Sequence, residues 1–142
     1  MDYQKVIEYK IQMLVDLMLT DGVSPSELSD NIFEKQYISI SFCKINGYVI
    51  GKLRFHENEN MMQNIQMIYT YTEDKKLIRI EEEENGKRFL LWDRKKREGE
   101  LVEELLYFMK CCYDSTQIER FIMTLPECLR SKIEKYIPNL SA

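Results

Sequence analysis

The sequence has few residues of the kinds that carry catalytic or metal chemistry. Its 142 residues include a single histidine, His56, and four cysteines, none of which form a Cys-x-x-Cys pair. A zinc site needs three or four ligands, so one histidine without a close cysteine pair excludes the common zinc motifs. A glycine-rich phosphate loop, Gly-x-Ser-x-Gly and His-Glu-x-x-His are also missing. We therefore expect a protein that has no catalytic residues, no metal and no cofactor.

Long apolar runs and a secretory pattern are missing as well. The longest apolar stretches fall far short of the ~20 residues that a membrane helix needs. Asp2 and Glu8 interrupt the N-terminal segment, and no small-residue cleavage site follows. We therefore expect a cytoplasmic protein that does not enter a membrane. In that compartment the cysteines are expected to be buried, reduced thiols: Cys43, Cys111, Cys112 and Cys128.

Glycine and proline are scarce, with five and three residues. This scarcity excludes long flexible linkers and low-complexity tracts. The hydrophobic share of 44% and the charged share of 31% are typical of a globular protein. A chain of this length buries roughly two-thirds of the surface that it exposes when unfolded. We therefore predict one domain that spans residues 1–142.

The net charge of −4 is confined to the N-terminal region. Residues 1–36 hold seven acidic and three basic side chains, whereas the other 106 residues hold 17 of each sign. The missing basic excess argues against nucleic acid as a partner, and the acidic region favours a basic protein. The one strongly basic run, residues 94–97, follows the four glutamates at 81–84 by ten residues. We interpret this run as a solvated or screened segment, and we leave open a phosphate-binding role.

Apolar residues at three- and four-residue spacing predict helices on both sides of a central region. The first is expected at about residues 3–20, with Asp2 as its cap and Gly22 as its stop. A capping box that begins at Ser24 predicts a short second helix to about residue 34. The helical period returns at residues 97–112, again after Asp114, and from residue 126.

Two Asn-Gly pairs mark the hairpins of a sheet between these helices. Asn46-Gly47 and Asn85-Gly86 are the residue pair that type I′ turns prefer, because both turn positions need positive φ. Apolar and polar residues alternate on both sides of each pair, and a further turn is expected at residues 74–75. We therefore predict an α+β fold. Its five-stranded antiparallel meander carries two N-terminal helices and two to three C-terminal helices packed on it.

The turns also predict which side chains share a face of the sheet. They place Ile38 opposite Phe55, Tyr71 opposite Ile78, and Ile80 opposite Leu91. The first face should lie against helices, and its residues are Ile38, Ile40, Leu53, Phe55, Tyr69, Ile80 and Leu91. The second face mixes apolar, aromatic and charged side chains, and its residues are Thr70, Thr72, Leu77, Arg79, Glu81, Arg88, Leu90 and Trp92.

These features favour a non-catalytic protein-binding module that uses an acidic or aromatic surface. An inhibitor or an immunity-type antidote to a basic toxin would be one instance. Tryptophan and arginine are common in interfaces, and the second face holds both types. The residues expected to bind the partner are Asp2, Glu8, Asp16, Asp30, Arg79, Glu81, Glu83 and Trp92.

Two other functions stay open at this level. A carrier of a small ligand, or a minor enzyme, would use a pocket between the sheet and the helices, and Tyr69, Tyr71, Phe89 and His56 would line its mouth. A homodimer without further activity would form through a sheet edge or through the second face. The sequence does not decide whether C-terminal helices cover that face.

Overall fold

The computed structural model describes residues 2–56 and 64–137. They fall into two compact units, which are described separately below. The sheet unit comprises residues 20–95, and the helical unit comprises the chain before and after it. The expectation that residues 1–142 form a single domain stays a prediction. Most of the loop expected at residues 56–62 lies outside the described residues.

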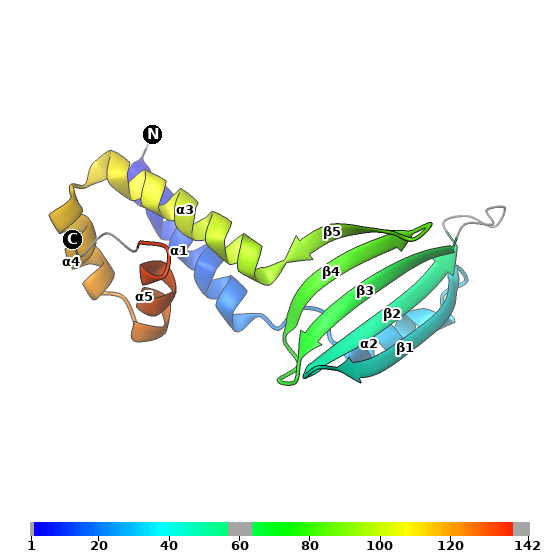
Figure 1. Cartoon of the computed structure of the whole chain (residues 1–142). Coiled ribbons are helices and arrows are strands. Elements are labelled where there is room, and N and C mark those ends of the chain that lie inside the picture. The colour runs from blue at the N-terminus through cyan, green and yellow to red at the C-terminus, as the bar shows by residue number, and fades with distance from the viewer. Residues whose placement is uncertain (1, 57–63, 138–142) are drawn as a thin grey trace. The chain divides into compact units, whose positions relative to one another are not determined.

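The sheet unit confirms the predicted meander. Five antiparallel strands lie side by side in chain order, with β1 and β5 at the two edges (Figure 1). The strands are β1 (Tyr37–Ile45), β2 (Tyr48–His56), β3 (Asn64–Thr72), β4 (Leu77–Glu84) and β5 (Lys87–Asp93). The short helix α2 (Pro25–Asp30) and the 3₁₀ turn η1 (Asn31–Phe33) precede them. The α+β class and the antiparallel meander are therefore both present.

The two Asn-Gly pairs form the expected turns. Asn46 and Gly47 have φ values of 52° and 83°, and Asn85 and Gly86 have 53° and 78°. Positive φ at both positions defines the type I′ turn, whose twist matches that of the flanking strands. Next to the turns the predicted registers are confirmed, with Ile45 opposite Tyr48 and Glu82 opposite Phe89.

Three bulges change the register farther from the turns. In β1 the chain shifts at Ile38, so that Phe55 lies opposite Tyr37, and the centroids of these two rings are 5.6 Å apart. The predicted pair of Ile38 with Phe55 is therefore wrong, and Ile38 is 43% exposed. A bulge adds one residue to one strand, so side chains beyond it change faces relative to an unbulged strand.

The other two bulges lie on either side of β4. Leu77, rather than Ile78, lies opposite Tyr71. Trp92, rather than Leu91, lies opposite Ile80. Leu77 and Trp92 therefore belong to the first face, and their predicted place on the second face is wrong. The prediction assumed unbroken alternation, which a bulge interrupts without any obligatory residue type.

The first face of the sheet forms the core of the sheet unit. Leu28 of α2 is buried together with Leu53, Tyr71 and Leu77, and all four are at most 3% exposed. Ser24 is the N-cap of α2, since the Glu27 amide donates to Ser24 Oγ at 3.2 Å, and Leu28 of this helix faces the core. The half-buried residues around this core are Val23, Tyr37, Ile40, Val49, Met67, Tyr69, Ile80 and Trp92.

The helical unit contains the first helix and the three C-terminal ones. They are α1 (Tyr3–Leu19), α3 (Arg94–Cys112), α4 (Ser115–Met123) and α5 (Glu127–Glu134). The first two residues of α3, Arg94 and Lys95, belong to the sheet unit. Helix α4 begins with a capping box in which Asp114 and Gln117 bond each other's main-chain amides at 2.8 and 2.9 Å. Lys10 of α1 pairs with Glu104 of α3 at 2.6 Å.

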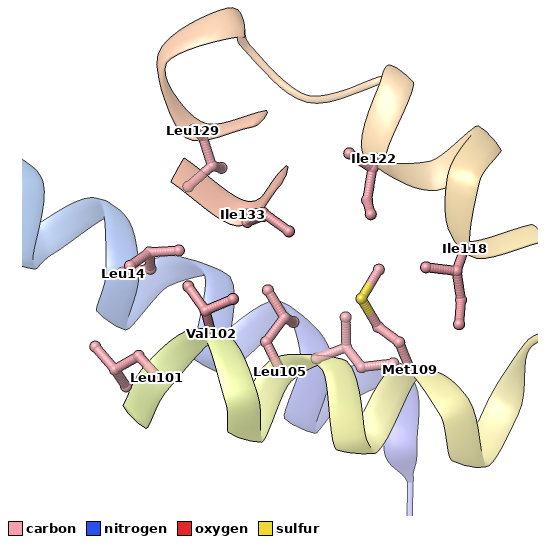
Figure 2. Packing of buried hydrophobic residues seen from close by; sticks show 10 residues of the cluster. Leu14, Leu101, Val102, Leu105, Met109, Ile118, Ile122, Leu129 and Ile133 are labelled. Atoms are coloured by element: carbon pink, nitrogen blue, oxygen red, sulfur yellow. The ribbon is translucent and has the colours of Figure 1, made fainter. Parts of the chain in front are cut away.

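The apolar stripes of these four helices face one another (Figure 2). Leu105, Val102 and Met109 of α3 are fully buried, as are Leu14 of α1 and Ile133 of α5. The half-buried residues packed on this cluster also come from the helices and their connections. The sequence expectation had these stripes against the sheet. Periodicity shows that a stripe is buried, but it does not identify the surface that buries it.

Candidate functional site at the β5 edge

Strand β5 is an edge strand, with a neighbouring strand on one side and an open edge on the other. Among the strands that the structure describes, β5 is hydrogen-bonded to β4 alone. In a two-residue hairpin the flanking residues, here Glu84 and Lys87, exchange hydrogen bonds. Residues of β5 then alternate, so the N–H and C=O groups of Arg88 and Leu90 point toward the open edge. An edge of this kind presents main-chain groups to which another strand can bind.

The bulge in β5 exposes three successive large apolar side chains. Leu90 lies opposite Glu81 and Trp92 opposite Ile80, which leaves Leu91 without a partner in the ladder. Phe89, Leu90 and Leu91 are 51%, 50% and 52% exposed. Phe89 and Leu90 precede the bulge and point to opposite faces, as their partners Glu82 and Glu81 do, and the extra residue Leu91 follows them. Large apolar side chains are therefore exposed on both faces along this edge.

Two ion pairs flank Leu90 on the second face. Arg88 Nε lies 3.1 Å from Glu83 Oε2, and Arg79 Nε lies 3.3 Å from Asp93 Oδ2. Both arginines are about half exposed, so each pair contributes at most about 1 kcal/mol to stability. Their main effect is to place alternating charges on the two sides of an apolar centre. We call these four residues, together with Phe89, Leu90 and Leu91, the β5 surface.

Trp92 has a structural position beside this surface. It lies on the first face, half-buried, with the guanidinium carbon of Arg94 5.3 Å from its ring centroid. Arg94 also donates from Nε to the Leu77 carbonyl at 2.7 Å and from Nη2 to the Thr20 carbonyl at 2.9 Å. On the second face, Asp93 lies opposite Arg79. Arg94, which the sequence placed in a basic run, binds protein carbonyl groups.

The structure brings together only part of the predicted binding set. Arg79, Glu81 and Glu83 share the second face of the sheet, on β4. Asp30 ends α2 and is exposed. The other three carboxylates are exposed in the helical unit: Asp2 precedes α1, and Glu8 and Asp16 lie on it.

The acidic N-terminal region does not form one surface within a unit. Helix α1 belongs to the helical unit, and the rest of that region belongs to the sheet unit. By residue count, the helical unit holds 11 acidic and 9 basic side chains and the sheet unit 13 and 11, so each has a net charge of −2. Glu83 on the sheet is also paired with an arginine.

Sequence reasoning missed Phe89, Leu91 and Asp93 as surface residues. The signal that could have found them is the run Phe89-Leu90-Leu91-Trp92, which interrupts the alternation expected of a half-buried strand. Four successive large apolar residues in a strand that has one neighbour indicate either a bulge or an exposed surface. Here both are present.

The cysteines are surface residues, which corrects the expectation of buried thiols. Cys43, Cys111, Cys112 and Cys128 are all exposed and free. Cys43 points away from the core because it alternates with Phe42 on β1. Among the described residues, no group of histidine, cysteine and acidic side chains could hold a metal ion.

The aromatic residues expected to line a pocket have other positions. Tyr71 is fully buried, and its hydroxyl donates to the Val23 carbonyl at 2.6 Å. Burial, followed by the neighbouring Tyr69 and Glu27, raises the pKa of Tyr71 above its ordinary value. Burial also raises the pKa of Tyr69. Both hydroxyls are therefore held neutral, and Tyr71 serves the core. His56 is the half-buried last residue of β2.

No described helix is long and apolar enough to cross a membrane. Comparison of the chain with protein-family models, with curated proteins and with solved structures found no match.

Proposed function

We propose that this chain is a non-catalytic protein-binding module that binds its partner through the β5 surface. The observation that carries the proposal is the run Phe89, Leu90 and Leu91, half exposed on an edge strand. Large exposed apolar side chains with a polar rim are typical of protein–protein interaction sites. The pairs Arg88–Glu83 and Arg79–Asp93 supply that rim.

The open edge supports binding by strand addition. An extended segment that lies along β5 would hydrogen-bond the main chain of Arg88 and Leu90 and cover the apolar side chains between the two ion pairs. Main-chain bonds supply affinity in this mode, and alternate side chains supply specificity. The charges of both signs on this surface fit a partner that also carries both signs.

The narrower expectations stay proposals. We propose a cytosolic location, because four exposed free thiols persist most readily in a reducing compartment. An inhibitor or immunity-type antidote to a basic protein stays a separate, narrower proposal. The residues expected from the sequence to bind that protein are Asp2, Glu8, Asp16, Asp30, Arg79, Glu81, Glu83 and Trp92.

A photo-crosslinking residue at position 91 tests the proposal in the full chain, inside cells that express it. We expect covalent capture of a protein from this position. Adding Leu90→Lys should abolish capture, because it places a charge at the apolar centre. The matched control is Ile45→Lys, since Ile45 is 46% exposed on the other edge strand, and capture should persist with it. The proposal would be refuted if the Leu90→Lys variant were still captured, or if no protein were captured from position 91 at all.

A further inference from the structure

We infer that the partner of the β5 surface is a second copy of this chain, with the two β5 strands paired antiparallel about a twofold axis at Leu90. The inference rests on the proposed function and specifies its partner. An isologous contact of this kind needs a surface that is complementary to itself after a half-turn. The arrangement of charges along β5 meets that requirement.

The second face shows the charge complementarity directly. Its rows across β4 and β5 are Glu83–Arg88, Glu81–Leu90 and Arg79–Asp93. Among these second-face rows, that of Arg88 comes directly before that of Leu90, and that of Asp93 comes directly after it. A half-turn about Leu90 places Arg88 opposite the partner subunit's Asp93. Since Arg88 already binds Glu83 and Asp93 already binds Arg79, four alternating charges then run across the contact.

The bulge is what makes this match. Along an unbulged strand, Arg88 would lie opposite the partner subunit's Trp92, two positions beyond Leu90. The extra residue, Leu91, moves Asp93 into that row and onto the same face as Arg88. Opposite charges in facing positions of neighbouring strands stabilise their pairing, whereas like charges oppose it.

The apolar side chains match in the same register. Leu90 faces the partner subunit's Leu90 on the second face. On the first face, Phe89 lies one row before Leu90 and Trp92 lies one row after it. The half-turn therefore places Phe89 opposite the partner subunit's Trp92. Aromatic pairs across neighbouring strands are favourable, and these two pairs cover Leu90 and Phe89, which are 50% and 51% exposed in one copy.

The backbone agrees with this register. The N–H and C=O groups of Leu90 point toward the open edge, so two Leu90 residues at the axis form a hydrogen-bonded pair. The opposite edge of the sheet has no such complementarity, because β1 contains one charged residue, Lys44, and no acidic one. A contact of β1 with β5 would be heterologous and would not close into a dimer.

Sedimentation equilibrium of the full chain over a wide range of concentrations tests the inference. The wild type should reach twice the monomer mass and dissociate on dilution. Leu90→Lys and Leu90→Glu should each weaken association at least about tenfold, because each places like charges at the axis. Ile45→Lys, the matched change on β1, should associate as the wild type does. Circular dichroism verifies that every variant is folded.

Mixing Leu90→Lys with Leu90→Glu should restore a dimer, which a merely damaged sheet would not do. The inference is overturned if the wild type stays monomeric at every concentration. It is also overturned if the single variants still dimerise, or if the folded mixture stays monomeric. A monomeric wild type that is still captured from position 91, in a manner that Leu90→Lys abolishes, would refute the second copy and retain the proposed function.

Discussion

Replacing Tyr71 by phenylalanine tests the main polar contact of the sheet unit. The Tyr71 side chain is fully buried, and its hydroxyl donates to the Val23 carbonyl at 2.6 Å. The ring packs identically in phenylalanine, so the change removes one hydrogen bond and leaves the carbonyl without this donor. We expect a loss of about 1–3 kcal/mol in the free energy of unfolding at neutral pH. Urea unfolding followed by Trp92 fluorescence measures it.

The same variant should behave differently in alkali. Burial raises the pKa of Tyr71 above its ordinary value of 10.0, so the folded state keeps a proton that the unfolded state loses. The stability from this group is complete below pH 10 and declines above it, by at most about 1.4 kcal/mol per pH unit. The phenylalanine variant lacks this decline. The stability difference between wild type and variant should therefore narrow above pH 10.

The control for Tyr71→Phe is Tyr9→Phe, because Tyr9 is 63% exposed. It should leave the free energy of unfolding unchanged within about 0.5 kcal/mol at neutral pH. Two results contradict the reasoning. One is a Tyr71→Phe variant as stable as the wild type at neutral pH, and the other is a difference that stays constant or widens above pH 10.

Two further predictions concern a turn and the organisation of the chain. Gly22→Ala should cost about 1–3 kcal/mol, because φ is +85° and a Cβ would lie 2.9 Å from Leu77 Cβ. Gly47→Ala has a similar φ of +83° and open space, so a smaller cost there isolates the clash, and equal costs in urea unfolding would exclude it. Leu105→Ala in the helical core and Leu53→Ala in the sheet core should each cost about 2–5 kcal/mol. If residues 1–142 form one domain, both variants shift a single unfolding transition that far-ultraviolet circular dichroism and Trp92 fluorescence follow alike. A Trp92 fluorescence transition that Leu105→Ala leaves unchanged would contradict the single domain.

The sequence was sufficient for the elements and for the registers next to the two Asn-Gly turns, but not for the register next to the turn at residues 74–75. Asn46-Gly47 and Asn85-Gly86 require positive φ at two positions, and few other residues satisfy this, so the hairpins could be placed with their first pairs. The N-caps Ser24 and Asp114 placed two helix starts for the same kind of reason.

The bulges and the candidate site could not be predicted in this way. A bulge at Leu91 requires no particular residue, and its cost depends on packing against β4. Every residue beyond a bulge changes faces relative to an unbulged strand, so one missed bulge placed Trp92 on the wrong face. The same missed bulge meant that the pair of Arg79 with Asp93 was not predicted. The exposure of Phe89 follows from the edge position of β5, which is a property of the whole sheet.

The contact of Arg94 with Thr20 has a consequence for the chain as a whole. Residues 20 and 94 stand at the two ends of the sheet unit, and Arg94 Nη2 lies 2.9 Å from the Thr20 carbonyl oxygen. The sheet unit is therefore an insertion between the two segments of the helical unit, and the Arg94 side chain bonds the start of the inserted unit to its end. In the path of the chain, the sheet unit, residues 20–95, lies between α1 and all but the first two residues of α3. A change in the length of the strands or their turns would then leave the two segments of the helical unit unchanged.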